Sequence, residues 1–332
     1  MTRVRVGIAG ARRVREGLGP FVARELRAAG ADVVAFAGTT PESVAAAGRA
    51  LAEAGAAGAR GYVGVGALLA AEPLDALAIL SPAQTHAACL EAALAAGVHV
   101  LCEKPFVWGD ADPAGLAQRL VTDFAAKGRV LRENCQWPYA LPAFEALHPG
   151  AIAAGRPPRS FAMRLSPSST GARMLVDVLS HPLSVLQALC GAKAGRIDGV
   201  RFSTRDREAD ALEVGFTLRA PGGDVDVSVA LVGRGAPPRE AWLAIDGHVA
   251  RRTIRPRDYV LGLEADGRRV ELPDPLGGLI RDFVAAVRAA VAAAEDRSAA
   301  PPPAADAIAW RMSGLCEIVR AFEGSAPGGD RR

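Results

Sequence analysis

The chain has 332 residues, half of them hydrophobic, and a formal net charge of only +3. This length favours two domains over one, and the absence of any basic block or aromatic-interleaved stretch argues against a nucleic acid partner. The five cysteines are dispersed without a C-x-x-C pair, so we predict no metal site or disulfide framework and expect a reducing compartment. Without a signal-like start or a membrane-length apolar run, the sequence predicts a cytoplasmic protein.

The first part of the chain alternates apolar strands with helices. A Thr39-Thr40-Pro41-Glu42 segment is typical of a helix start, and Gly97 is typical of a helix end. Apolar strands separated by helices indicate a parallel sheet covered on both faces. We therefore expect a doubly wound α/β domain over residues 1–130, with ligands at the carboxyl ends of its strands. The predicted strands are 4–9, 32–37, 75–81 and 98–102, and the predicted helices include 18–29 and 84–96.

After residue 131 the pattern changes to alternating strands separated by turn residues. One long helix is predicted over 172–189, and two helices, 276–293 and 304–322, close the chain. We expect an α+β domain with a largely antiparallel open sheet over 131–323, followed by a disordered tail over 324–332. Its predicted strands are 200–204, 212–218, 225–231, 242–246 and 259–264.

The turn after the first strand carries part of a dinucleotide fingerprint. Gly10 occupies the first glycine position of G-x-G-x-x-G, but Arg12 and Arg15 occupy the other two. Taken alone, an ordinary strand-to-helix turn explains this segment equally well. The second strand ends without the carboxylate that binds an NAD ribose, and arginine suits a 2′-phosphate. We therefore expect NADP, with NAD as the alternative, and these cofactor-binding residues: Gly10, Ala11, Arg12, Arg13, Gly38, Thr39 and Thr40. The two threonines also fit a simple helix cap.

Lysine is rare in this chain, which has three lysines (Lys104, Lys127 and Lys193) against 36 arginines. Lys104 directly follows the apolar run 98–102. A desolvated lysine can release a proton, whereas arginine keeps its proton at any working pH. Lys104 is therefore predicted to handle a proton or hold a substrate; the alternative is a surface lysine at a strand end.

Asp177 and His181 are four residues apart on the predicted long helix and so share one face, which Arg173 and Ser184 continue. A polar stripe on an otherwise apolar helix is costly unless its groups pair or line a cleft. Out of context, an Asp–His hydrogen bond within the core is the slightly favoured alternative. Pro182 should kink or restart the helix.

Together these motifs make a specific pattern: Ser81-Pro82, His86, the segment 93–105 ending in Glu103-Lys104-Pro105, and Asp177-x-x-x-His181. With them, the chain resembles the glucose–fructose oxidoreductase, inositol dehydrogenase and rhizopine-catabolism family over nearly its whole length. The resemblance implies a Rossmann domain followed by an α/β domain, with dimers or tetramers formed through the open sheet. It also implies that Lys104, Asp177 and His181 are catalytic at the nicotinamide, and that the cofactor site is lined by Ser81, Pro82, His86 and Glu103.

The expected reaction is reversible hydride transfer between NADP and a secondary alcohol or carbonyl of a small-molecule sugar, polyol or related metabolite. His181 would act as general acid or base, Lys104 would bind the reacting oxygen, and Asp177 would orient His181. The family often has an asparagine shortly after the Ser-Pro motif, where this chain has Ala83 and Gln84. It also often has an acid three residues after the catalytic histidine, where this chain has Ser184, and this second difference favours a substrate other than a simple sugar. Candidate substrate residues, each with a plain packing or surface alternative, are Asn134, Trp137, Arg164, Arg173 and Ser184.

Two other function classes fit the same fold. A non-redox sensor of a nucleotide or metabolite is favoured by the altered glycine turn and disfavoured by the intact Lys104, Asp177 and His181. An NAD-dependent glycoside hydrolase, a variation within the family, would keep its cofactor through purification and show no net redox change.

Overall fold

The computed structural model of the chain describes residues 3–12, 18–153, 155–191, 194–233, 239–255, 260–295 and 306–324. It divides into two compact units, each assembled from segments far apart in the sequence: Met1–Asn134 with Leu276–Ala309, and Cys135–Pro275 with Trp310–Arg332. The first closing helix thus belongs to unit 1, whereas the sequence pattern places both closing helices in the second domain. Apart from Gly324, the predicted tail over 324–332 lies outside the described residues.

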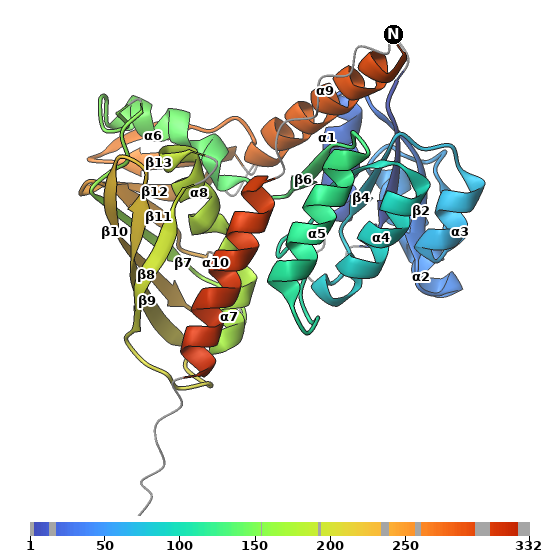
Figure 1. Cartoon of the computed structure of the whole chain (residues 1–332). Helices are drawn as coiled ribbons and strands as arrows, with labels where there is room; N and C mark the ends of the chain where they lie inside the picture. The colour runs from blue at the N-terminus through green and yellow to red at the C-terminus, as the bar shows by residue number, and fades with distance from the viewer. Residues whose placement is uncertain are drawn as a thin grey trace, which may run out of the picture. The chain divides into compact units, whose positions relative to one another are not determined.

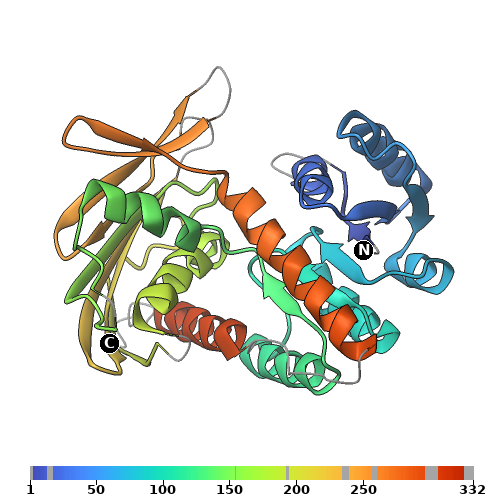
Figure 2. The ribbon, with the colours of Figure 1, turned by 90° about the horizontal axis from the view of Figure 1, so that it is seen from above.

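Unit 1 is built on a parallel sheet with the order β3-β2-β1-β4-β5-β6. Its strands are β1 (Arg5–Ala9), β2 (Asp32–Gly38), β3 (Arg60–Val63), β4 (Ala76–Ile79), β5 (His99–Cys102) and β6 (Leu131–Glu133). Its helices are α1 (Gly19–Ala28), α2 (Pro41–Glu53), α3 (Val65–Ala71), the 3-10 turn η1 (Ala83–Thr85), α4 (His86–Ala96), α5 (Pro113–Ala126) and α9 (Pro275–Glu295). In Figures 1 and 2, α1 and α2 cover one face of the sheet and α4 and α5 cover the other. The predicted doubly wound sheet is confirmed, with β4 and β5 buried at every residue.

Local signals in the sequence fix several helix ends of unit 1. The Thr40 hydroxyl accepts a hydrogen bond from the Ser43 backbone N–H at 3.2 Å, and the Ser43 hydroxyl accepts one from the Thr40 N–H at 3.0 Å. This reciprocal cap satisfies two N–H groups that the start of α2 leaves unpaired. At the end of α4, Gly97 has a φ of 69°, which glycine adopts without steric cost. The predicted start at Thr40 and the predicted end at Gly97 are both confirmed.

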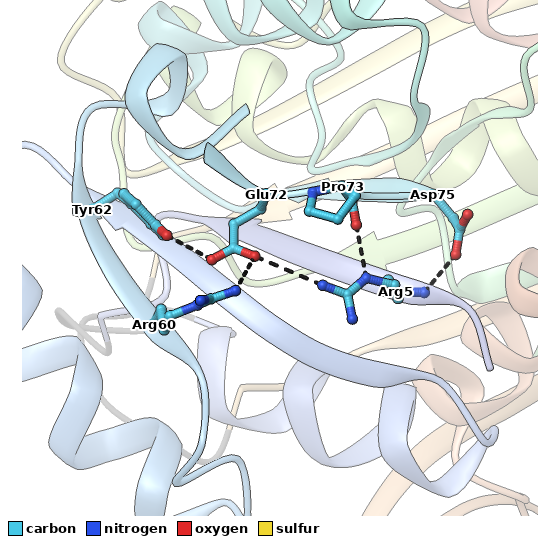
Figure 3. Close-up of polar contacts among 6 residues, drawn as sticks. All are labelled: Arg5, Arg60, Tyr62, Glu72, Pro73 and Asp75. Atoms are coloured by element: carbon cyan, nitrogen blue, oxygen red, sulfur yellow. Dashed lines mark hydrogen bonds and ion pairs between the residues drawn. The ribbon is translucent and has the colours of Figure 1, made fainter. Parts of the chain in front are cut away.

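A polar cluster around the buried Glu72 holds the amino ends of β1, β3 and β4 together (Figure 3). The Glu72 side chain is fully buried and accepts hydrogen bonds from the Tyr62 hydroxyl and the Arg60 guanidinium, both at 2.6 Å. Arg5 lies 3.7 Å from the same carboxylate, and its backbone N–H donates to Asp75 at 2.7 Å. The Tyr62 and Arg60 contacts lower the pKa of Glu72. This cluster therefore stabilises the sheet at the amino ends of its strands, away from the carboxyl ends where a ligand is expected.

Unit 2 contains an eight-stranded sheet in the order β14-β13-β12-β11-β7-β10-β9-β8, antiparallel except for the β7–β10 pair. Its strands are β7 (Ser160–Leu165), β8 (Arg196–Phe202), β9 (Ala211–Ala220), β10 (Gly223–Val232), β11 (Trp242–Ile245), β12 (His248–Arg255), β13 (Val260–Ala265) and β14 (Arg268–Glu271). Its helices are the 3-10 turn η2 (Trp137–Ala140), α6 (Leu141–Leu147), α7 (Ala172–Val178), α8 (Ser180–Cys190) and α10 (Asp306–Glu323). In Figure 1, α7, α8 and α10 lie on the same side of the sheet. The predicted α+β domain with a largely antiparallel sheet is confirmed.

The single helix predicted over 172–189 is two helices, α7 and α8, separated at Leu179. Pro182 has no N–H to donate to the carbonyl of Val178, so the helix ladder is interrupted there and begins again with Pro182 in its first turn. The prediction of one continuous helix was therefore wrong, and the prediction that Pro182 restarts the helix is confirmed. Within the described ranges, no helix combines the length and apolarity needed to cross a membrane.

Candidate active site

Lys104 lies in the turn that follows β5, at the carboxyl edge of the unit 1 sheet, and this turn is anchored by buried neighbours. Its peptide bond to Pro105 is cis. The Phe106 backbone N–H donates to the Glu133 carboxylate at 3.1 Å, and the Cys102 thiol donates to the Phe106 carbonyl at 3.7 Å. Phe106 and Cys102 are fully buried, and Glu133 is 2% exposed. The backbone around Lys104 is thus held by the core, while Lys104 itself is only partly buried.

His86 links this turn to the turn that follows β4. The imidazole is buried, with Nε2 2.7 Å from the Ser81 carbonyl oxygen and Nδ1 3.0 and 3.2 Å from those of Pro105 and Phe106. Carbonyl oxygens only accept hydrogen bonds, so the ring donates to both turns only when both nitrogens carry a proton. Burial lowers the pKa of His86, while its three carbonyl partners act in the opposite direction. His86, predicted to line a cofactor site, thus lies between the two turns that form that edge.

A hydrogen bond between the side chains of Asn134 and Glu103 lies beside Lys104. The Asn134 side-chain amide donates to the Glu103 carboxylate in a very short hydrogen bond, and the Asn134 backbone N–H donates to the Cys102 carbonyl at 2.8 Å. Burial raises the pKa of Glu103, while the neighbouring Lys104 ammonium and the Asn134 amide oppose this rise. Asn134, predicted to contact substrate, thus supports the turn that carries Lys104.

The glycine turn after β1 is built for close backbone packing. Gly10 has a φ of 82°, and a Cβ atom there would lie 2.5 Å from the Ser81 backbone nitrogen. At Gly19, the first residue of α1, a Cβ atom would lie 2.1 Å from the Ala11 carbonyl oxygen. Gly19 thus supplies the close helix–strand approach that the third fingerprint glycine normally provides. Sequence analysis missed it because it lies well beyond the expected spacing. Arg12 is exposed.

The other predicted cofactor residues follow β1, β2 and β4 in the chain. Arg13 lies outside the described residues, as does Arg15. At the end of β2, Thr39 is exposed, and the Thr40 hydroxyl is engaged in the cap of α2. Ser81 and Pro82 form the turn before η1, where the Thr85 hydroxyl donates to the Ser81 hydroxyl at 2.7 Å.

In unit 2, Asp177 lies in the last turn of α7 and His181 in the first turn of α8, and both side chains are partly buried. The Ser184 hydroxyl donates to the His181 carbonyl at 2.7 Å, so it bonds its own helix. The role of Ser184 in binding substrate stays a prediction. Arg173 is exposed on α7. The turn η2 packs against α8, and the Cys135 thiol donates to the Ser180 carbonyl at 3.6 Å.

The substrate arginines are distributed differently from the prediction. Arg164 forms an ion pair with Glu240 at 3.1 Å, on the face of β7 opposite to the buried Met163 and Leu165. Arg164 is thus paired with a carboxylate on that face, and its role as an anion clamp stays a prediction. Trp137, which is 9% exposed, has the Arg252 guanidinium carbon 5.7 Å from its ring centroid. Arg252 was not predicted, because nothing in an arginine-rich sequence distinguishes it.

A parallel sheet of this strand order, with a glycine turn after β1, defines a dinucleotide-binding fold. Residues 4–135 match the family described as "Oxidoreductase family, NAD-binding Rossmann fold". Over these residues the chain is similar to that oxidoreductase family, in agreement with the resemblance to glucose–fructose oxidoreductase and inositol dehydrogenase that the sequence motifs indicate.

Individual relatives agree with this family. The chain is 32% identical over 165 residues to UDP-N-acetylglucosamine 3-dehydrogenase of Acidithiobacillus ferrooxidans, a match that covers 48% of this chain and 49% of that protein. It thus spans about half the length of this curated relative. It is also 34% identical over 124 residues to D-apiose dehydrogenase of Paraburkholderia graminis, covering 37% of this chain and 31% of that protein.

Solved structures match over nearly the full chain. The structure of the same A. ferrooxidans enzyme has a TM-score of 0.66 at 22% identity and covers 98% of this chain and 99% of that chain. An inositol dehydrogenase homologue from Azotobacter vinelandii complexed with NAD+ has a TM-score of 0.68 at 17% identity, covering 98% and 96%. At these identities the likeness establishes the fold alone.

Proposed function

We propose that the protein is a nicotinamide-dependent oxidoreductase that interconverts a secondary alcohol and a carbonyl on a sugar, polyol or related metabolite. The observation that carries this proposal is Lys104 held at the carboxyl edge of a Rossmann sheet by the buried His86, Phe106 and Glu133. A chain that fixes the backbone around one of its three lysines from several sides is organised to position that amine.

The chain's own residues divide the work of alcohol oxidation. His181 takes the hydroxyl proton as general base, and Asp177 orients the imidazole and fixes its tautomer. Lys104 donates a hydrogen bond to the same oxygen and stabilises the negative charge that develops on it. The alcohol carbon loses a hydride and becomes a carbonyl carbon, and the bound nicotinamide supplies the acceptor for that hydride. In the reverse direction His181 returns the proton.

The turn after β1 fits a dinucleotide. Gly10 lets this turn pack closely against the Ser81 backbone, so the ends of β1 and β4 lie side by side, and the N-terminus of α1 follows in the chain. We infer that NADP is preferred over NAD, because Thr39 and Arg12 are exposed and none of the described residues 36–40, at the end of β2, carries a carboxylate. Arg12→Gln should raise the Kd for NADPH by about tenfold and change that for NADH little.

We further propose a cytoplasmic homodimer or homotetramer formed through the open face of the unit 2 sheet. Small, partly buried side chains alternate with fully buried ones on two of its central strands, at Ala162 and Ala230, so a second sheet can approach closely there. All five cysteines are free thiols, which suits a reducing compartment. Sedimentation of the purified chain tests the assembly, and a monomer at micromolar concentration would contradict it.

Nucleotide analysis separates the oxidoreductase from its two alternatives. The nucleotide released by denaturing the purified protein is identified, and NADPH fluorescence is then followed with keto-sugars and nucleotide-linked keto-sugars. Oxidation of bound NADPH by one of these compounds supports the oxidoreductase. Binding without oxidation supports a sensor, and tightly retained NAD with glycoside cleavage and no net redox change supports the hydrolase.

A further inference from the structure

Arg252 is placed differently from the other arginines of its strand. Along β12 the buried Ala250 marks the covered face of the sheet, and Arg252 shares that face by the two-residue alternation of a strand. Arg251 points to the opposite face and pairs with Glu240 at 3.2 Å. Two adjacent arginines therefore have different surroundings, one open and neutralised and the other partly buried beside Trp137.

Arg252 carries a charge that the described part of the chain does not neutralise. Within that part it forms no ion pair; one Nη2 donates to the Arg239 backbone carbonyl at 2.9 Å, and its Nε is buried without a hydrogen-bond partner. Burial, and then the nearby positive charge of Arg239, lower the pKa of Arg252. A partly desolvated cation beside a second cation is costly unless an anion joins them.

We propose that Arg252 and Arg239, with Trp137 beneath Arg252, form a subsite for the phosphate group of an anionic substrate. A guanidinium presents several N–H donors in a fixed plane, which suits phosphate oxygens better than a neutral sugar hydroxyl. The indole face of Trp137 holds the Arg252 guanidinium in place by a cation–π contact. The substrate class is a sugar that carries a phosphate, either as a simple ester or through a nucleoside diphosphate.

The location of this subsite connects it to the reaction. Trp137 lies in η2, which packs against α8, and α8 carries His181 in its first turn. The Cys135 thiol, two residues before Trp137, donates to the Ser180 carbonyl next to His181 at 3.6 Å. The link between subsite and reaction rests on the proposed role of His181, but the anion site itself does not.

Anion binding is measured by calorimetry with the full chain saturated with NADP+, so that the dinucleotide's own phosphate sites are occupied. The probes are UDP, inorganic pyrophosphate and glucose 1-phosphate. Arg252→Met, which keeps the apolar stem on Trp137, should weaken binding of the preferred probe by about 10- to 100-fold, the range expected for charge-assisted hydrogen bonds. Arg251→Met is the matched control on the opposite face and should change the Kd less than twofold. If Arg252→Met does not fold, Arg239→Met takes its place with the same expectation.

The probes also identify the phosphate source. UDP bound at least tenfold more tightly than pyrophosphate indicates a nucleotide-linked sugar, and tightest binding of glucose 1-phosphate indicates a simple ester. The proposal is overturned if the wild-type protein binds none of the probes, if Arg252→Met binds them as the wild type does, or if Arg251→Met weakens them equally. His181→Ala should keep the probe affinity while losing turnover. If it keeps both, the redox assignment fails and the anion site stands.

Discussion

The Nε2 atom of His86 lies 2.7 Å from the carbonyl oxygen of Ser81 inside the core of unit 1. Its other nitrogen faces the carbonyl oxygens of Pro105 and Phe106. One imidazole thus ties the turn after β4 to the turn that carries Lys104, and it has only acceptors as hydrogen-bond partners. From this arrangement we predict that His86 positions the turn that carries Lys104.

Replacing His86 should change the surroundings of the Lys104 amine more than it changes the overall fold. A glutamine side chain cannot place polar atoms at both positions that the two ring nitrogens occupy, so His86→Gln should release one of the two turns and change the NMR chemical shift of a ¹³C-methylated Lys104 amine. The chain has only three lysines, so the signals are readily assigned. Lys127, whose ammonium donates to the Leu94 carbonyl at 2.9 Å on the exposed side of α4, is the internal control.

A double-mutant cycle separates positioning from general damage to the fold. If His86 acts through Lys104, the fall in kcat caused by His86→Gln should disappear when Lys104 is already methionine. An equal fall in both backgrounds, or a Lys127 signal that moves as far as that of Lys104, would assign His86 a purely structural role.

Gly10→Ala should weaken dinucleotide binding and stability together. The added methyl would meet the Ser81 backbone at 2.5 Å in a backbone conformation with a φ of 82°, so we expect a cost of about 1–3 kcal/mol and a higher Kd for NADPH. Gly66→Ala on α3 is the matched control, because a Cβ there meets nothing within 4 Å. That change should be neutral or stabilise the helix by up to about 1 kcal/mol. Equal behaviour of the two variants in urea titration would contradict the packing role of Gly10.

The Glu72 cluster in Figure 3 should contribute to stability at neutral pH and lose its contribution in acid. Because the pKa of Glu72 is lowered in the folded chain, the stabilisation is present above the unfolded pKa of 4.5 and is lost as the pH falls through the folded pKa. Glu72→Gln places an amide N–H₂ against the arginines and should cost about 1–3 kcal/mol at pH 7. Glu91→Gln removes an exposed pair with Arg119 and should cost less than about 1 kcal/mol. A Glu72→Gln variant with the same acid limb as the wild type would contradict this assignment.

His99 should cause the protein to lose stability as the pH falls from 6.5 to about 4. Burial, followed by the charge of Arg129, lowers its pKa from 6.5 to about 4. The unfolded chain therefore takes up a proton first, and stability falls as the pH drops through this window, by on the order of 3 kcal/mol in total. His99 Nδ1 accepts from the Val130 N–H at 2.8 Å and its Nε2 has no partner, so the neutral ring is the one that fits. His99→Gln should flatten the pH dependence of unfolding, whereas exposed His248→Gln should leave it unchanged.

The fold could be predicted from the sequence because apolar strands, helix caps and helix-ending glycines are each recognisable in a short segment of the chain. Uniformly apolar strands such as β4 and β5, the cap at Thr40 and the glycine at Gly97 each specify their own structure. The strand β12 was missed because its charged residues hide the alternation, and β3 because most of its residues are exposed. The helix is interrupted at Leu179 because Pro182 has no backbone N–H, and this effect outweighs the helical pattern of the residues around it.

The candidate site was less predictable, because its supporting contacts join residues distant in sequence. Glu133 and Phe106 carry no motif, yet their hydrogen bond fixes the turn beside Lys104. Gly19 replaces a fingerprint glycine from outside the usual spacing, and neither the pairing of Arg164 with Glu240 nor the bond of Ser184 to a backbone carbonyl has a signal in the sequence. Such exchanges depend on three-dimensional partners that a single sequence does not reveal.

The most direct test of the central claim is single-turnover oxidation of bound NADPH by the best carbonyl substrate, compared among the wild type, Lys104→Met and His181→Ala. We predict that both variants bind NADPH with an unchanged Kd and that the rate falls by about 10²–10⁴-fold, the usual contribution of a positioned proton donor. Variants that oxidise NADPH at the wild-type rate would show that neither side chain takes part in the chemistry.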